Sequence, residues 1–180
     1  MKVVAIVGMN GSGKSEVARI FEEEGFVRIR FGDLTDREVT RRGLELSEEN
    51  ERQVREQLRQ EHGMAAYAEL NIPLIDAALK QSNVVVDGLY SWEEYKLLKE
   101  RYGEDLFVVA VYSSPRTRRK RLPQRHIRPL TPAESAIRDF NEIENLGKGG
   151  PIAMADFTLI NESSMKELQK ETEQLIGKLA

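Results

Sequence analysis

The 180-residue sequence contains no cysteine and only two histidines, His62 and His126. The lack of cysteine excludes disulfide bonds, cysteine-ligated zinc and a thiol nucleophile. With so few histidines, a histidine-rich metal site is not expected either. Disulfide-stapled domains, cysteine-zinc proteins and thiol enzymes are therefore excluded as classes.

Long hydrophobic runs are also absent, since no apolar stretch approaches the ~18 residues of a transmembrane helix. The sequence begins directly on a predicted core strand, so we expect no signal peptide, a cytoplasmic location and no membrane partner. Neither sign of charge dominates, because 27 Lys/Arg and 30 Asp/Glu give a formal net charge of −3. Any attraction to nucleic acid must therefore be local, and we do not expect nucleic acid as a partner.

One glycine-rich stretch organises the chain. Residues Gly8–Ser15 fit the spacing G-x-x-x-x-G-K-[ST], between the apolar strand Lys2–Val7 and a helical pattern over Ser15–Glu24, which is the layout of a P-loop. Its backbone N–H groups form an anion nest, Lys14 reaches the β- and γ-phosphates, and the Ser15 hydroxyl holds Mg²⁺. The sequence therefore predicts ATP and Mg²⁺ as cofactors. The predicted nucleotide-binding residues in this stretch are Gly8, Asn10, Gly11, Ser12, Gly13, Lys14 and Ser15.

Four further apolar runs read as strands, namely Phe26–Phe31, Val84–Asp87, Leu106–Tyr112 and Phe157–Ile160. They alternate with helical segments, which predicts one α/β domain over residues 1–180 with a mostly parallel sheet. The two long inserts, 33–63 and 116–150, follow the carboxyl ends of strands, where ligands bind in such sheets.

Two details of this pattern carry expectations about packing. Within the second insert a capping box at Thr131 opens a helix, and Lys148–Pro151 is predicted to be a loop. The helix over Glu48–His62 has few apolar residues, chiefly Val54 and Leu58, and we expect it outside the core.

An acid stands at the end of the Val84–Asp87 strand. A carboxylate in this position orients the Mg²⁺ shell of many P-loop enzymes, so Asp87 is a predicted metal-binding and catalytic residue together with Lys14 and Ser15. The alternative is that Asp87 caps the following turn.

The segment from Pro115 to Arg128 holds seven Lys/Arg and no acid. Arg121 and Arg125 are four residues apart and share a helix face. Arginines at a transferring phosphoryl group stabilise its negative charge, so both are predicted to be catalytic. The alternatives are a solvated helix face or a nucleic-acid patch.

The segment Phe31–Arg37 places an acid and an arginine one helical turn apart after a glycine turn. Asp33, Arg37 and Arg41 are the predicted acceptor-binding residues, with Arg37 as the phosphate ligand. The alternative is a charged surface helix with internal ion pairs.

Taken together, these motifs resemble the P-loop nucleoside monophosphate kinases, and more closely the archaeal adenylate-kinase-related proteins that are also described as similar to dephospho-coenzyme A kinase. The resemblance implies a five-stranded parallel sheet of order 2-3-1-4-5, an acceptor-binding region at about 33–70 and a lid at about 126–131. It also implies that Arg121 stacks on the adenine and that Arg125 contacts phosphates. Arg128 and Arg138 lie where further lid arginines fall.

The resemblance implies a kinase that transfers the γ-phosphoryl group of MgATP to a small nucleotide-type acceptor, in a monomer or homodimer. A nucleoside monophosphate is favoured, and dephospho-coenzyme A, whose hydroxyl would need Asp33 as a base, is the alternative. The chain departs from the family after Asp87-Gly88, where the expected Phe-Pro-Arg is replaced by Leu89-Tyr90-Ser91. The missing arginine leaves room for a nucleotide-binding regulator or a weak ATPase that acts through a partner.

Overall fold

The computed structural model of the protein describes residues 1–125 and 129–179. Its strands are β1 (Val3–Val7), β2 (Val27–Arg30), β3 (Val84–Asp87), β4 (Leu106–Tyr112) and β5 (Phe157–Ile160). They form one parallel sheet in the order β2-β3-β1-β4-β5, in which Val3 of β1 lies opposite Val84 and Leu106. The predicted fold class and strand order are therefore confirmed.

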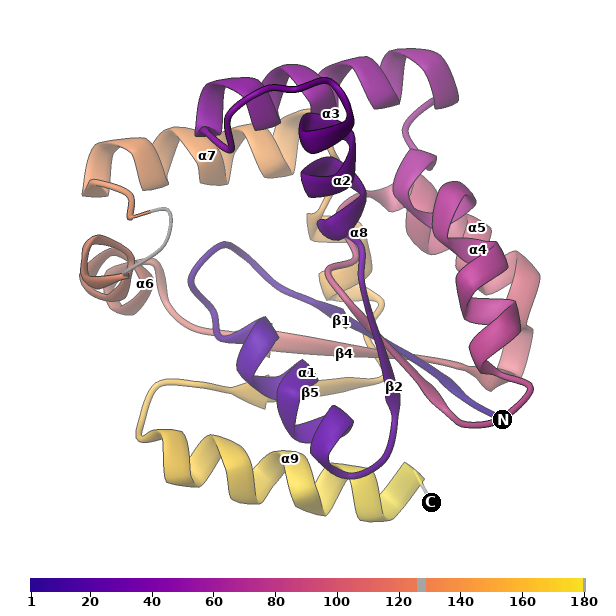
Figure 1. Cartoon of the computed structure of the whole chain (residues 1–180). Helices are drawn as coiled ribbons and strands as arrows, with labels where there is room; N and C mark the ends of the chain where they lie inside the picture. The colour runs from indigo at the N-terminus through magenta and orange to yellow at the C-terminus, as the bar shows by residue number, and fades with distance from the viewer. Residues whose placement is uncertain (126–128, 180) are drawn as a thin grey trace.

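Helices surround this sheet (Figure 1). They are α1 (Lys14–Glu23), α2 (Asp33–Arg41), α3 (Glu48–His62), α4 (Ala66–Ala78), α5 (Trp92–Tyr102), α6 (Pro115–Arg121), α7 (Pro132–Glu144), α8 (Gly149–Ala153) and α9 (Met165–Leu179), with 3-10 turns at Gly103–Asp105 and Leu122–Gln124. Serine or threonine side chains cap α3, α5, α6 and α7 at Ser47, Ser91, Ser114 and Thr131. No helix of the described residues is long and apolar enough to cross a membrane.

Two apolar clusters give the fold its three layers. Alternate residues of β1 point to opposite faces, so that Val3 and Ala5 join one cluster and Val4 and Ile6 join the other. The first face is covered mainly by α4 and α5, with contributions from α2, α3 and α8. The second face is covered by α1 and α9. Burial on both faces explains why β1, β3 and β4 are near-continuous apolar runs.

Two expectations about the inserts are corrected by the structure. The helix α3 is not outside the core, because Val54 and Leu58 are 0% and 6% exposed and belong to the first cluster. Two apolar residues four apart are enough to seat this otherwise polar helix on the fold. The predicted loop at Lys148–Pro151 is the start of α8, which packs on Trp92 through Gly150.

The inserts gather at one end of the sheet. Figure 1 shows α2 and α3 on one side and α6 and α7 on the other, beyond the carboxyl ends of the strands, with α3 and α7 running close together. This is the end at which the P-loop connects β1 to α1. The topology therefore brings the P-loop and both inserts to the same place.

Candidate active site

The P-loop has the backbone that its glycines permit. Gly8, Gly11 and Gly13 have φ values of 154°, 84° and 104°, in the region that side chains disfavour. A Cβ on Gly8 would lie 2.4 Å from the carbonyl oxygen of Val111, and one on Gly13 would lie 2.4 Å from Asn161 Nδ2. Contacts as well as dihedral angles therefore require glycine here.

Lys14 folds back over this loop. Its ammonium donates hydrogen bonds to the carbonyl oxygens of Gly8 and Met9 at 2.8 and 3.0 Å. Burial, followed by the positive charge of Lys148, lowers the pKa of Lys14 to about 7. An anion bound in the loop would reverse this effect, because a nearby negative charge favours the protonated amine.

Two polar groups in the loop lack partners. The Ser12 hydroxyl and the Asn10 amide nitrogen Nδ2 are buried without a hydrogen-bond partner. Buried polar groups are normally satisfied, so both atoms mark a place where a ligand would supply the missing bonds.

The predicted metal-binding residues face each other. Ser15 Oγ lies 3.5 Å from Asp87 Oδ1, while Asp87 Oδ2 accepts a hydrogen bond from Arg28 Nη2 at 2.6 Å. Mg²⁺ prefers oxygen ligands and is commonly held by one or two protein groups together with water and phosphate oxygens. The hydroxyl and the remaining carboxylate oxygen therefore fit a Mg²⁺ ion that is shared with a nucleotide.

The predicted arginines of the basic segment lie beside the P-loop. Arg121 donates to the backbone oxygen of Asn161 at 3.1 Å and to Ser113 Oγ at 3.2 Å. Arg125 donates to Asn10 Oδ1 at 3.2 Å. Both guanidinium groups are therefore available at the edge of the nucleotide loop. Of the predicted lid, residues 126–128, including Arg128, lie outside the described residues.

Sequence patterns did not single out Arg118, which is the most buried arginine of α6 at 3% exposure. Its guanidinium makes a two-pronged pair with Asp139 of α7 at 2.7 and 2.9 Å, and also donates to the backbone oxygens of Asn10 and Ser113. Asn161, at the end of β5, adds a bond from Nδ2 to the Ser12 oxygen at 2.9 Å. These two residues fix the loop from the side of β4 and β5.

A cavity of about 1070 Å³ opens beside this site. Its walls come from α2, α3 and α7, with Tyr90 and Lys148 among the lining residues. The lining holds six cations and seven carboxylates: Arg30, Arg52, Arg55, Arg59, Arg138 and Lys148, with Asp36, Glu48, Glu49, Glu51, Glu56, Glu134 and Glu142. The cavity is therefore strongly charged without a net positive excess.

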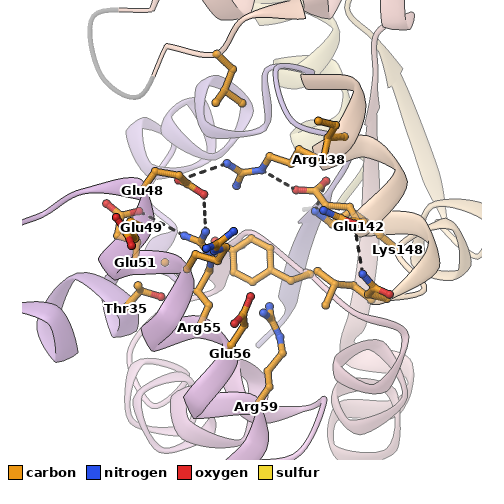
Figure 2. Close-up of a pocket in the computed structure, with 18 of the residues that line it drawn as sticks. Thr35, Glu48, Glu49, Glu51, Arg55, Glu56, Arg59, Arg138, Glu142 and Lys148 are labelled. Carbon is orange, nitrogen blue, oxygen red and sulfur yellow. Dashed lines mark hydrogen bonds and ion pairs between the residues drawn. The ribbon is translucent and has the colours of Figure 1, made fainter. Parts of the chain in front are cut away.

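A chain of alternating charges crosses the cavity (Figure 2). Lys148 Nζ lies 2.7 Å from Glu142, which also accepts from Arg138 Nε at 3.3 Å. Arg138 Nη1 lies 3.9 Å from Glu48 of α3, and Glu48 pairs with Arg55 at 2.7 Å. Burial would raise the pKa of Glu142, but Lys148, Lys14 and Arg138 lower it to about 2. The Glu142 carboxylate is therefore stabilised by the charge of Lys148 in the cavity wall and also by that of Lys14 in the P-loop.

None of the three predicted acceptor-binding residues lines this cavity. Asp33 pairs with Arg30 at 2.7 Å, Arg37 is exposed, and the Arg41 side chain is 72% exposed and pairs with Glu38. Their spacing of four places all three on one face of α2, and this face points to solvent. The opposite face presents Thr35 and Asp36 to the cavity, together with Gly32 at the start of the helix. The arginines that do reach the cavity come mainly from α3.

Comparison with solved structures places this fold in a class. The chain aligns over 99% of its length with a gluconokinase from Sinorhizobium meliloti 1021 (TM-score 0.63, 19% identity, 93% of that chain). It also aligns over 99% of its length with a shikimate kinase from Bacteroides thetaiotaomicron (TM-score 0.63, 12% identity, 98% of that chain). An APS kinase from Mycobacterium tuberculosis, solved with AMPPNP and APS, gives a TM-score of 0.56 at 20% identity over 99% of this chain and 96% of that one. The fold is therefore that of the P-loop kinases, as predicted.

Sequence comparison gives the family. A family model described as an AAA domain matches residues 4–147. UPF0200 protein TK1334 of Thermococcus kodakarensis is 40% identical over 181 residues, which cover 98% of this chain and 97% of the relative. A UPF0200 protein of Aeropyrum pernix is 39% identical over 171 residues, which cover 94% of this chain and 89% of the relative. The chain belongs to the UPF0200 family.

Proposed function

We propose that the protein is an ATP-dependent kinase that transfers the γ-phosphoryl group of MgATP to a small acceptor bound in the cavity. The observation that carries this proposal is that α7, which forms one wall of the cavity, is joined to the P-loop at one point by Arg118, which binds both Asp139 of α7 and the backbone oxygen of Asn10. A donor site and an acceptor site must share such a point for direct transfer. The likeness to solved kinases supports the same class of reaction.

Each residue of the site has a role in this reaction. The P-loop amides hold the donor phosphates, Lys14 reaches the transferred group, and Ser15 and Asp87 hold Mg²⁺, which neutralises the charge that develops on the phosphates. Arg121 and Arg125 flank the loop, where Arg121 would contact the base and Arg125 the phosphates. No protein nucleophile is required, because positioning and charge stabilisation carry phosphoryl transfer.

A nucleoside monophosphate is the favoured acceptor. A phosphate oxygen attacks without a base, whereas the ribose hydroxyl of dephospho-coenzyme A would need one. Asp33, which the sequence predicts as the base for that hydroxyl, lies outside the cavity in an ion pair with Arg30. Among the carboxylates, Glu142 has the largest charge effect on the pKa of Lys14, but its own pKa of about 2 makes it a weak base. These observations favour attack by a phosphate.

The test is acceptor-stimulated ADP release from MgATP. Purified protein would be assayed with a panel of nucleoside monophosphates, dephospho-coenzyme A and a 5′-hydroxyl oligonucleotide. We expect a strong rise in ADP release with one nucleoside monophosphate, and loss of turnover in Lys14→Ala with an unchanged circular dichroism spectrum. Slow hydrolysis that ignores every acceptor would instead favour a nucleotide-binding regulator, and full turnover in Lys14→Ala would contradict the proposal.

A further inference from the structure

Lys148 is a buried cation on the wall of the cavity. It is 2% exposed, lines the cavity and begins α8 as its N-cap residue. Its ammonium lies 2.7 Å from Glu142 and 5.5 Å from the centre of the Tyr90 ring. Burial of an ion pair is costly, and such pairs often contribute little net stability. The contribution of the Lys148–Glu142 pair to folding stability therefore does not explain why it lies in the cavity wall.

Lys148 lies against Tyr90, in the segment that follows Asp87-Gly88. After Asp87-Gly88 the chain has Leu89-Tyr90-Ser91, so this segment brings no cation to the cavity. Ser91 is fully buried as the cap of α5, and Tyr90 presents its ring to the cavity. Lys148 follows Tyr90 by almost 60 residues in the sequence, and its ammonium lies over the Tyr90 ring. The segment around Tyr90 carries no cation, and Lys148 places one next to it in the cavity wall.

The Glu142 carboxylate occupies a position in which a bound anion could replace it. Its carboxylate is surrounded by Lys148, Arg138 and, at longer range, Lys14. Three cations around one point repel one another unless a negative charge lies between them. A phosphate group has the charge and the acceptor oxygens to take over these contacts.

We propose that Lys148 binds the anionic group of the acceptor, and that Glu142 is its counter-ion until the acceptor's anion displaces it. This assignment rests on the proposed kinase function and names a residue that binds the acceptor. It also defines the acceptor as a molecule with a phosphate or similar anion that either attacks or lies next to the attacking group.

The assignment predicts opposite effects of two substitutions. Lys148→Met removes the binding cation, so anion affinity falls. Glu142→Gln removes a competing carboxylate at nearly constant shape, so anion affinity rises. A pair that served only the fold would lower affinity in both variants, because each leaves a buried charge without its partner.

The experiment titrates sulfate, whose charge is constant over the usual pH range, into protein saturated with Mg²⁺ and AMPPNP, with calorimetric detection. Lys148→Met should weaken binding by about 10-fold or more, and Glu142→Gln should tighten it by about 3-fold or more, as expected for a charge-assisted hydrogen bond. Lys148→Arg should restore most of the affinity. Lys166→Met, which makes the same charge change on exposed α9, should stay within about 2-fold of wild type.

The remaining outcomes are separable. If Lys148→Met unfolds, the double variant Lys148→Met/Glu142→Gln removes both charges and should fold, yet bind sulfate about 10-fold or more weakly than wild type. If AMPPNP does not bind, the kinase function fails, and the same titrations in a Lys14→Ala background still test Lys148. Equal weakening in both single variants, unchanged binding in Lys148→Met, or no saturable sulfate binding to wild type would overturn the assignment.

Discussion

At the scale of single residues, Gly13 of the P-loop and Gly25 after α1 have similar φ values but differ in the contacts around them. Gly13 has a φ of 104°, and a Cβ there would press on Asn161 Nδ2, which donates to the Ser12 oxygen. Gly25, at the end of α1, has a similar φ of 89°, but a Cβ there would meet nothing within 4 Å. The two positions therefore separate backbone strain from steric contact.

Gly13→Ala is expected to lower the free energy of unfolding by about 2–4 kcal/mol and to abolish AMPPNP binding, because strain and displacement of Asn161 add. Gly25→Ala should cost only about 1 kcal/mol and leave binding intact. Urea unfolding and calorimetric titration measure both effects. Equal losses in the two variants, with nucleotide binding preserved, would show that contact with Asn161 is unimportant.

Glu94 offers a test of a buried carboxyl group. Its side chain is 0% exposed and accepts hydrogen bonds from the backbone nitrogens of Tyr90 and Ser91. Burial raises its pKa to about 7, although these bonds and the charges of Arg59 and Lys148 act in the opposite direction. Because the folded-state pKa lies above the unfolded value, the folded state holds its proton longer, and stability falls as pH rises towards 7.

The expected contribution from Glu94 is a loss of up to about 3 kcal/mol between pH 4.5 and 7. Glu94→Gln cannot titrate, so its free energy of unfolding should fall less than that of wild type over this range, with no further divergence above pH 8. Urea unfolding of both proteins at several pH values measures the difference. Parallel profiles would mean that folding does not raise the pKa of Glu94.

At the scale of elements, α6 is the connection between the P-loop and α7. Arg118 makes this connection, since its guanidinium reaches Asp139 and the backbone of Asn10 and Ser113. Removing one partner of a buried pair leaves the other charge uncompensated and costs about 3–5 kcal/mol. We therefore expect Arg118→Met to lower the free energy of unfolding by several kcal/mol and to weaken AMPPNP binding.

The neighbouring Arg119 is the matched control. It is exposed on the same helix, so Arg119→Met should change stability by no more than about 0.5 kcal/mol. Denaturant unfolding of both variants gives the comparison. A similar small effect from both would place Arg118 among the solvated arginines.

The same helix shows what the sequence could and could not predict. Helical spacing predicted one face for Arg121 and Arg125, but α6 ends at Arg121, and Arg125 follows the 3-10 turn Leu122–Gln124 in an extended conformation. Both side chains lie beside the nucleotide loop through contacts that the spacing did not predict. Helical spacing could not distinguish Arg118 from Arg116 or Arg119, because its partner Asp139 lies 21 residues away on another helix. Local pattern predicts a face, and long-range contact decides which residue on it is buried.

At the scale of the whole molecule, the fold was predictable because β1, β3 and β4 are near-continuous apolar runs and because α3, α5, α6 and α7 begin at serine or threonine caps. The P-loop was predictable because its eight residues are contiguous. The cavity was not, because its walls come from α2, α3, α7 and the residues around Tyr90 and Lys148. Arg37 and Arg41 do not line the cavity, and the sequence could not show this because charge alone does not tell one face of α2 from the other.

The helix α7 is held by a buried ion pair to α6 and by an exposed ion pair to α3. The buried pair Arg118–Asp139 fastens α6 to α7, with side chains 4% and 12% exposed. Across the cavity, α3 and α7 are joined by Arg138 and Glu48 at 3.9 Å, with side chains 35% and 48% exposed. A buried two-pronged pair resists salt, whereas an exposed long pair is screened. We therefore expect the cavity to open between α3 and α7 while α7 stays fixed to the P-loop.

Double-mutant cycles should measure this difference. The coupling energy between Glu48 and Arg138, from Glu48→Gln and Arg138→Met, is expected to be about 0.2–1 kcal/mol and to vanish in 1 M NaCl. Coupling between Arg118 and Asp139, from Arg118→Met and Asp139→Asn, should exceed about 2 kcal/mol and change little with salt. Strong, salt-insensitive coupling between Glu48 and Arg138 would mean that α3 and α7 are locked together, and an acceptor would then need another route into the cavity.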